Sequence, residues 1–482
     1  MKPTELPQPP ENESPGYFFP GYIPRLWKNR RLSYFHQGHL ITEDEQMYPI
    51  SSMADLASYA FSLELLIFVE SVLTFPYLEQ ASAEYGGVIY STPQGIPTAL
   101  QLHGKHKGHA CTRWLITSAS WQVYTPHMDL LLRLRTLFEH CGVGTATTPG
   151  ALGLQLQKRA FYETHGENWH AKRHPLPPWR CAEDLREYST GARSDLLVEA
   201  TATFDACWEL DMKNGYAAAF EQVPTGPTIP HQGNHLAQYA TYVARCTVVL
   251  DAPLVLGCFP VRTEHTISYP TAPGTYDAFL WKEEIELISA LPGCHVQTGA
   301  GWGWIETTTD NKRWIELMTE LRDTAPPEIV DWVKLAIVAS IGRHGCPWES
   351  TYLVQEGEQN ENDLPATWNG LAYDWYIHSA MIGIPESMQH WYAYTLMQCR
   401  LALYKYALPY AERGQLLATN TDGIYVANEA DVDNVVDKSD ACGKPSGTWR
   451  KSKLTDVQFP ALRHIVSKQK TRRPGIAKDR ET

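Results

Sequence analysis

The sequence lacks a long apolar run, and this absence excludes one class of protein. No stretch of the 482-residue chain approaches the roughly 20 consecutive apolar residues that a membrane-spanning helix needs. The longest candidate, FSLELLIFVESVLTF, is interrupted by Glu64 and Glu70. The N-terminal MKPTELPQPPENESPG is polar and rich in proline, which is typical of a flexible tail and not of a signal peptide. We therefore expect a cytoplasmic protein with no membrane partner.

Closely spaced cysteine pairs are also missing. The ten Cys residues are scattered and contain no C-x-x-C pair, which favours reduced thiols over a disulfide framework. One segment, HGKHKGHAC, brings His103, His106, His109 and Cys111 together, and these residue types can hold zinc. A solvated basic loop explains the segment better, because its Gly- and Lys-rich spacing fits a closed four-ligand site poorly.

The charge balance excludes a protein coated with positive charge. The formal net charge is −13, yet residues 438–482 contain 12 Lys and Arg against 4 Asp and Glu. A basic C-terminal segment on an acidic body can bind a polyanion. A solvated tail would account for the same count, so the charge pattern alone leaves both interpretations open.

The chain contains no internal repeat, and its apolar spacing predicts a mixture of helices and strands. Helical spacing predicts helices within residues 52–73, 127–141, 281–291, 311–324, 326–345 and 385–408. Apolar runs predict strands near 207–212 and 246–261, and a hairpin in LLATNTDGIYV, whose Asn-Thr-Asp-Gly centre is a tight turn. The Pro-rich segment at 170–180 predicts a linker.

Two of the predicted strands deliver an aspartate to a tight turn. Asp211 follows the apolar run of ELDMKNGYAAAF, and Asp422 lies in the turn of TNTDGIYV. Mg²⁺ prefers oxygen ligands and keeps several waters, so two carboxylates suffice to hold it. Two such ions can catalyse phosphoryl transfer. Acids at strand ends also form turns, so the pair by itself does not decide the function.

Several motifs in a fixed order resemble those of family B DNA polymerases. ELDMKNGYAAAF resembles the first polymerase motif, KLAIVASIGRHG the second and TNTDGIYV the third. LREYSTGAR resembles the Y-x-G-G/A motif before the palm, and GTWRKSKL resembles the segment that begins the thumb. The 123- and 88-residue gaps from Asp211 to Lys334 to Asp422 suit the protein-primed branch of phages and linear plasmids. The resemblance covers about residues 181–470.

The resemblance implies an α+β fold: a right-hand polymerase with an antiparallel-sheet palm, helical fingers and a small thumb, preceded by a reduced exonuclease-like α/β domain. It also implies a location in the cytoplasm of a bacterium or of a phage or plasmid host. The expected segments are a tail at 1–16, a degenerate exonuclease-like domain at 17–180, palm with insertion at 181–311, fingers at 312–345, palm with insertion at 346–437, and a basic thumb and tail at 438–482.

The resemblance also implies roles for single residues. Asp211 and Asp422 would hold two Mg²⁺ ions, or Mn²⁺, that activate the primer 3′-hydroxyl and neutralise the triphosphate. Tyr216 falls on the steric gate that excludes a 2′-hydroxyl, and without the motif it would be an ordinary half-buried aromatic. Lys334 and Arg322 fall on triphosphate contacts. Arg322 could equally be a solvated charge on a helix surface.

Further positions carry implied contacts with the nucleotide and with a DNA template-primer. The second-motif glycine, Gly342, would let the nascent base pair approach the backbone closely. The implied DNA contacts are Tyr188, Gly191, Arg193, Arg450, Lys451 and Lys453. The implied substrates are dNTPs, and the primer could be a terminal protein or a nucleic-acid 3′ end.

The sequence departs from the family pattern at several positions. The second motif carries Val338, Ala339 and Ile341 where the family has Asn, Ser and Tyr. Asn420 replaces the first Asp of the third motif, which removes a negative charge, and Gly423 replaces its Ser. In the remaining motifs, Ala217 stands for the usual Pro, and the Y-x-G-A segment has one extra residue. We expect that fidelity or metal affinity is reduced.

The exonuclease signature D-x-E does not occur before Asp211, which predicts a protein without proofreading. Three functions follow from these observations. The first is an active DNA polymerase, and the second is an inactive descendant that binds nucleic acid or serves as a scaffold. The third is an unrelated Trp-rich hydrolase that uses Asp and Glu pairs.

Overall fold

The computed structural model divides into two compact units. It describes residues 17–18, 30–72, 75–91, 97–106, 109–117, 121, 127–166, 174–191, 193–199, 201–263, 266–345, 349–355, 357–365, 375–381, 388–427, 435–437, 440, 444–469 and 471–472. Unit 1 comprises Met1–Glu13, Phe19–Arg159 and Thr324–Ser387, and unit 2 comprises Ser14–Phe18, Ala160–Asp323 and Met388–Thr482. The expected tail at 1–16 lies outside the described residues. No described helix is long and apolar enough to cross a bilayer.

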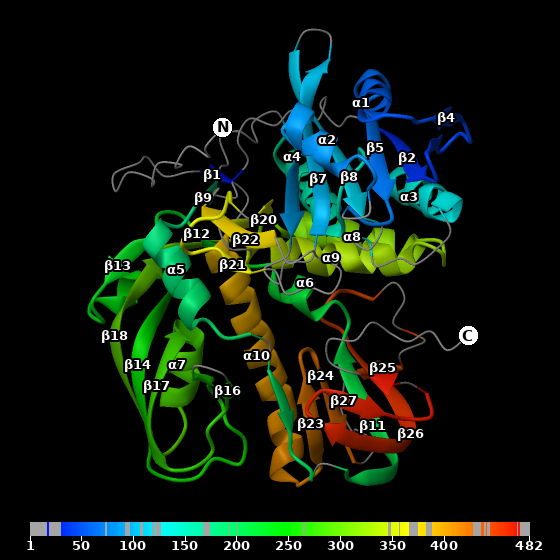
Figure 1. Ribbon diagram of the computed structural model, residues 1–482. Coiled ribbons are helices and arrows are strands. Elements are labelled where there is room, and N and C mark those ends of the chain that lie inside the picture. The colour runs from blue at the N-terminus through cyan, green and yellow to red at the C-terminus, as the bar shows by residue number, and fades with distance from the viewer. Residues whose placement is uncertain are drawn as a thin grey trace. The chain divides into compact units, whose positions relative to one another are not determined.

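Unit 1 is built on a ten-stranded mixed sheet (Figure 1). Along the sheet the order is β21-β22-β20-β6-β7-β8-β5-β2-β3-β4, with β5 parallel to β2 and to β8. The strands are β2 (Arg31–His36), β3 (His39–Thr42), β4 (Met47–Pro49), β5 (Leu65–Val69), β6 (Val88–Ser91), β7 (Pro97–His106), β8 (His109–Thr117), β20 (Glu349–Gln355), β21 (Leu364–Pro365) and β22 (Trp375–Met381).

Helices flank this sheet. They are α1 (Met53–Ser62), α2 (Leu78–Tyr85), α3 (His127–Cys141), α4 (Pro149–His165, whose end belongs to unit 2) and α9 (Val330–His344). Ser52 caps α1 by accepting a hydrogen bond from the Asp55 backbone N–H. α4 and α9 pack closely, because a Cβ at Gly153 would lie 2.5 Å from the carbonyl oxygen of Ala336.

Unit 2 contains an eight-stranded sheet in the order β10-β23-β24-β11-β26-β27-β28, with β25 also paired to β26. These strands lie side by side in the lower part of Figure 1. They are β10 (Ser194–Leu196), β11 (Thr203–Met212), β23 (Leu416–Asn420), β24 (Gly423–Val426), β25 (Val435–Asp437), β26 (Trp449–Ala461), β27 (His464–Val466) and β28 (Thr471–Arg472).

The long helix α10 (Gln389–Glu412) covers one face of this sheet. Leu403 and Ala407 of α10 are fully buried against Leu210, Ile424 and Val426 of the central strands. Burying large apolar side chains at about 25 cal/mol per Å² is the main force that fixes the helix there. The other face of the sheet packs against a smaller core of its own. Polar side chains gather at the ends of β11 and β24.

The remainder of unit 2 consists of a four-stranded sheet, short strand pairs and helices. The sheet, in the order β13-β18-β14-β17, is made of β13 (Ile229–His231), β18 (Cys294–Trp304), β14 (Thr241–Leu250) and β17 (Gly274–Trp281). The pairs are β1 (Tyr17–Phe18) with β9 (His174–Pro175), β12 (Val223–Thr225) with β19 (Glu306–Thr308), and β15 (Val261–Arg262) with β16 (Ile267–Ser268). The helices are α5 (Trp179–Tyr188), α6 (Gly215–Ala219), α7 (Lys282–Ser289) and α8 (Lys312–Thr324).

The helix expected within residues 52–73 is correct only in its first half. α1 ends at Ser62, and β5 follows at Leu65–Val69 with every side chain buried. The residue spacing in a short apolar run does not distinguish a buried strand from a buried helix. Here the run is a strand that lies between two parallel neighbours. The helices expected at 127–141, 281–291 and 311–324 are confirmed.

Strand pairing joins two of the expected segments to distant strands. In the segment expected as palm with insertion at 346–437, β20 pairs with β6 of unit 1 through Leu353 and Ile89. In the segment expected as thumb and tail at 438–482, β26 pairs along nine positions with β11 in the sheet that carries Asp211. The names and limits of the expected segments stay predictions. Neither long-range pairing has a local signal in the sequence.

Candidate active site

The two aspartates lie on neighbouring strands of one sheet. Asp211 is opposite Gly423 in the antiparallel register of β11 and β24. Asp422 occupies the two-residue turn between β23 and β24, and its carbonyl oxygen accepts a 2.9 Å hydrogen bond from the Met212 N–H. The hairpin expected from LLATNTDGIYV is therefore confirmed. Folding brings together two segments that are 211 positions apart in the chain.

Glycines make room beside both carboxylates. A Cβ on Gly215 would lie 3.0 Å from the Cβ of Asp422 and 3.5 Å from its Oδ2. A Cβ on Gly423 would lie 3.3 Å from the Cβ of Asp211. A side chain at either position would crowd the aspartates.

Asp211 has a cationic neighbour that the sequence did not indicate. Arg450 lies opposite Asp211 on the neighbouring strand β26 and donates a hydrogen bond to Asp211 Oδ2. The other carboxylate oxygen, Oδ1, is buried and has no hydrogen-bond partner among the described residues. Asp422 Oδ1 accepts a hydrogen bond of 3.0 Å from the Thr421 hydroxyl. The site thus has one carboxylate held by its own turn and one held by an arginine.

Tyr216 lies on α6 directly after the glycine that contacts Asp422. Burial raises the pKa of the Tyr216 hydroxyl above its ordinary value, and the nearby negative charge of Asp422 raises that pKa further. The phenol is therefore neutral over the physiological range. Asn214, in the left-handed conformation with φ of 50°, starts the turn that presents Tyr216.

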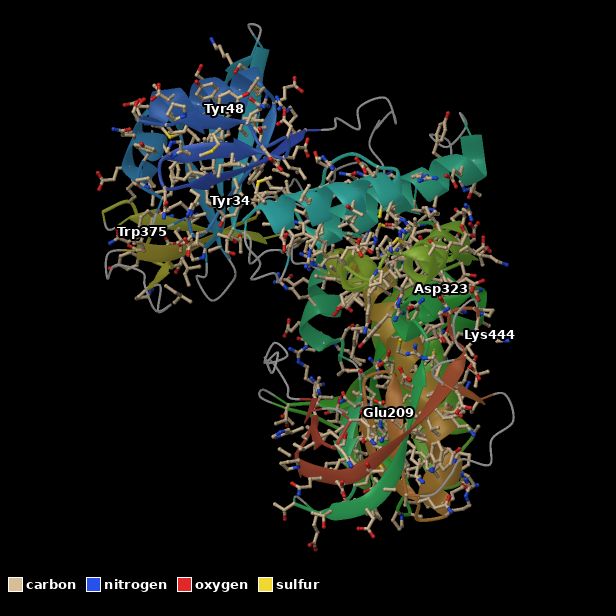
Figure 2. The ribbon with its side chains drawn as sticks, turned by 90° about the vertical axis from the view of Figure 1, so that its right-hand side faces the viewer. Tyr34, Tyr48, Glu209, Asp323, Trp375 and Lys444 are labelled. Carbon is tan, nitrogen blue, oxygen red and sulfur yellow. The ribbon has the colours of Figure 1, made fainter. Side chains whose placement is uncertain are left out.

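A polar network joins this turn to α8 and to the start of β26. Arg322 donates to Asn214 Oδ1, and Asn214 Nδ2 lies 3.2 Å from the Ser446 hydroxyl. Next to it, buried Lys213 donates 2.8 Å hydrogen bonds to Asp323 Oδ2 and to the carbonyl oxygen of Lys444, both labelled in Figure 2. Lys213 and Asn214 were missed, although both belong to the motif around Asp211.

Buried contacts fix the Y-x-G-A segment and the arginine that follows it. Arg193 is only 2% exposed. It binds Asp195 and the carbonyl oxygen of Gly257, and it stacks 4.3 Å above the ring of Tyr269. A guanidinium engaged in this way stabilises the fold, and its contact with DNA stays a prediction.

The other members of that segment are more accessible. Tyr188 is half-buried, with the Arg245 guanidinium 4.2 Å from its ring centroid. Gly191 is half-buried, and its carbonyl oxygen accepts a hydrogen bond of 3.3 Å from Arg400. Tyr188 and Gly191 stay predicted DNA contacts.

The basic residues of β26 lie on its two faces. Lys451 and Lys453 lie 5.5 and 6.0 Å from the ring centroid of Trp208, on the face away from Arg450. Lys453 is exposed and Lys451 is half-buried. Both stay predicted DNA contacts, whereas Arg450 faces the carboxylates.

Lys334 and Gly342 are in the other unit. Both lie on α9 of unit 1, whereas the aspartates, Tyr216 and Arg322 belong to unit 2. Lys334 is exposed, and Val338 one turn further is 47% exposed. Their share in a nucleotide site stays a prediction.

The oxygen donors fit a hard divalent cation. Two adjacent aspartates, with the buried Asp211 Oδ1 unused, supply the ligand type that Mg²⁺ or Mn²⁺ prefers. Across the described residues, no group of three or more His, Cys, Asp or Glu side chains is placed to hold a metal ion. A pair of carboxylates would leave the remaining positions to water and substrate.

The histidine-rich segment forms the end of a hairpin. His103 pairs with Thr112, whereas Cys111 pairs with the adjacent Gly104. Successive residues of a strand alternate between its faces, so His103 and Cys111 lie on opposite faces. The four residues therefore do not form one zinc site. The side chains of His106 and His109 lie outside the described residues.

The fold is similar to that of DNA polymerases. Several similar solved structures are of Phi29 DNA polymerase. The complex of that polymerase with primer-template DNA has a TM-score of 0.68 and 12% sequence identity, and the comparison covers 93% of this chain and 92% of that chain. Its complex with primer-template DNA and incoming nucleotides has a TM-score of 0.68 and 10% identity, with 93% of both chains covered. Its complex with single-stranded DNA has a TM-score of 0.66 and 12% identity, again with 93% of both chains covered. No model of a known protein family and no curated protein matches the sequence. At this identity the similarity concerns the fold.

Proposed function

We propose that the protein is a template-directed DNA polymerase that adds deoxynucleotides to a primer 3′-hydroxyl. The observation that carries the proposal is the pairing of β11 with β24, which puts Asp211 and Asp422 side by side. A fold similar to a DNA polymerase over 93% of both chains supports the same reaction. Phosphoryl transfer needs little covalent chemistry from the protein, so positioning and charge carry the catalysis.

Each residue of the site has a role in this proposal. Asp211 and Asp422 would hold divalent cations, which when bound lower the barrier by neutralising the triphosphate and activating the hydroxyl. The ring of Tyr216 excludes a 2′-hydroxyl from the sugar pocket. Arg322, next to Asn214, binds a triphosphate oxygen. Lys334 supplies a further positive charge to the triphosphate.

The finer assignment is a family B enzyme of the protein-primed type, with fingers around α8 and α9 and without proofreading. The missing D-x-E motif supports the loss of proofreading. A 5′-labelled primer that stays intact with Mg²⁺ in the absence of dNTPs is expected. Shortening of that primer by the purified wild type and equally by Asp211→Asn, whose change lies in the polymerase site, would contradict this assignment.

Primer extension with Mg²⁺ and dNTPs tests the proposal. The wild type should extend a primed template, and Asp211→Asn and Asp422→Asn should each lower the rate at least a thousandfold. Asp205→Asn is the matched control, because Asp205 is an exposed residue of the same strand. Absence of extension by the wild type, beside an active reference polymerase, would count against the proposal.

A second function is favoured by specific observations. Asn420 replaces an acid, and Arg450 already binds Asp211. Both features suit an inactive descendant that binds nucleic acid or serves as a scaffold. DNA affinity that is unchanged in the Asp211→Asn/Asp422→Asn double variant, together with no extension by the wild type, would select this function.

A further inference from the structure

The side chain opposite Asp211 is a cation, the guanidinium of Arg450. Arg450 and Asp211 face each other in the register of β26 and β11, so both side chains leave the sheet on the same face. The guanidinium binds Asp211 Oδ2, and the two side chains are only 12% and 20% exposed. Partly buried charges are screened less by salt than charges on the surface.

The pair leaves hydrogen-bonding capacity unused on both sides. Asp211 Oδ1 and Arg450 Nε are both buried, and neither has a hydrogen-bond partner among the described residues. A bidentate pair would use two N–H groups and both carboxylate oxygens. The contact is therefore weaker than arginine geometry allows, and it leaves Oδ1 open to another positive group.

A second carboxylate lies on the same face of the sheet. Glu209, two residues before Asp211, is 4% exposed and stands opposite Ser452, two residues after Arg450. It accepts hydrogen bonds of 2.9 Å from the Tyr425 hydroxyl and 3.2 Å from the Ser452 hydroxyl. Figure 2 shows Glu209 within the sheet. Diagonal neighbours across paired strands are within reach of long side chains, so Arg450 can reach either acid.

We propose that Arg450 is a built-in competitor of the divalent cation at Asp211. The guanidinium neutralises Asp211 when no metal is bound, and it turns to Glu209 when Mg²⁺ or Mn²⁺ binds. The two cations repel each other at one carboxylate, so occupancy by one disfavours the other. Metal loading is thereby coupled to the position of Arg450. This inference deepens the proposed function and rests on it.

Mn²⁺ titration of the full chain, followed by the electron paramagnetic resonance of free Mn²⁺ without DNA or nucleotide, tests the inference. Arg450→Gln should bind Mn²⁺ at least tenfold more tightly than the wild type, because the competitor is gone. Asp211→Asn should lose this binding. Arg413→Gln is the matched control for net charge, since Arg413 is exposed at the end of α10. It should leave the Mn²⁺ affinity unchanged.

Glu209→Gln should change the Mn²⁺ affinity in the opposite direction to Arg450→Gln. Without Glu209 as an alternative acceptor, Arg450 stays on Asp211, so Mn²⁺ binding should weaken at least threefold. In the Arg450→Gln background the same change should have no further effect, because Glu209 acts through Arg450. A Glu209→Gln effect of equal size in both backgrounds would show direct electrostatics and overturn the positioning role.

Mn²⁺ affinity of Arg450→Gln that is equal to or weaker than that of the wild type would overturn the inference. If the variant does not fold, crystals of the wild type with and without Mn²⁺ decide. Arg450 on Glu209 in the loaded crystal supports the inference, and Arg450 still on Asp211 beside bound Mn²⁺ overturns it. These measurements use no primer, so their failure is distinct from a failure of primer extension.

Discussion

Tyr216 is the residue that we propose as the determinant of sugar selection. Its ring follows the glycine beside Asp422, and burial raises the pKa of its hydroxyl, so a neutral aromatic lies near Asp422. In the proposed role the sugar of the nucleotide lies against this ring, which leaves no space for a 2′-hydroxyl. This proposed discrimination depends on the ring's volume and not on its hydroxyl.

We predict that Tyr216→Ala increases incorporation of ribonucleotides relative to deoxynucleotides at least tenfold. Tyr216→Phe should retain the discrimination of the wild type, because it keeps the ring. Single-nucleotide incorporation with each sugar, measured as kcat/KM, checks both variants. Equal discrimination by Tyr216→Ala and Tyr216→Phe would contradict the role of the ring.

Arg193 shows how far a residue's role can be inferred from its motif. The sequence placed this arginine in a DNA-binding segment, and the structure buries it between Asp195 and Tyr269. The burial of Arg193 depends on the folded chain and cannot be predicted from the segment YSTGAR alone. Asp211 and Asp422 could be paired from the sequence because the motifs around them follow a known order.

We predict that Arg193→Ala lowers the free energy of unfolding by about 3 kcal/mol, because it leaves the Asp195 carboxylate without its buried partner. Urea denaturation measures the change. Arg186→Ala, at an exposed position of α5, should cost about 0.5 kcal/mol or less. Arg193→Ala should leave the DNA affinity per folded molecule unchanged. A weaker affinity would support the predicted contact of Arg193 with DNA.

At the scale of elements, α8 has an ion pair near its end and an aspartate–histidine contact just before its start. Near its end, Asp323 binds Lys213. Just before its start, the Asp310 carboxylate lies 3.2 Å from His165 Nε2 and 3.1 Å from His174 Nε2. Burial alone would raise the pKa of Asp310, but the hydrogen bond and charge of His174 outweigh it and hold the pKa at about 2.

We predict that Asp310→Asn reduces stability in a pH-dependent way. Because the folded pKa lies below the unfolded value of about 3.9, the carboxylate stabilises the fold above pH 4 and loses this contribution as the pH falls toward 2. The difference in unfolding free energy between wild type and variant should shrink by about 2 kcal/mol between pH 5 and pH 2. Urea denaturation across this range measures it, and a constant difference would contradict the account.

Elements differed in how well the sequence predicted them. α3, α7 and α8 have amphipathic spacing that fixes their limits. β5 and the pairing of β20 with β6 had no such signal, since a central strand is apolar on both faces and its partners lie far away in the chain. Arg450 was missed as a neighbour of Asp211 for the same reason: only the register of β26 with β11 brings them together.

At the scale of the whole molecule, an acidic chain of net charge −13 has 12 of its 41 Lys and Arg residues within 438–482. Lys451 and Lys453 of β26 lie near the ring of Trp208 on β11. In the proposed function, this strand would offer positive charge and an aromatic face to a nucleic acid. Residues 473–482 of the expected basic thumb and tail at 438–482 lie outside the described residues. Affinity for DNA should therefore depend steeply on salt.

We predict that the Lys451→Ala/Lys453→Ala variant reduces the slope of log affinity against log salt by about 2, close to one for each phosphate that the variant no longer neutralises. Lys405→Ala, at an exposed position of α10, should leave the slope unchanged. Fluorescence anisotropy with a labelled primer-template from about 50 to 200 mM salt measures the slopes. Equal slopes for the wild type and the double variant would contradict a role for this strand.

The central claim is that Asp211 on β11 and Asp422 in the neighbouring β23–β24 turn form a site for template-directed nucleotide addition. Single-nucleotide extension on four primed templates that differ only in the templating base tests it most directly. The account predicts that the wild type adds only the complementary deoxynucleotide to each template and that Asp211→Asn adds none. Extension that ignores the templating base, or extension by Asp211→Asn at the wild-type rate, would contradict it.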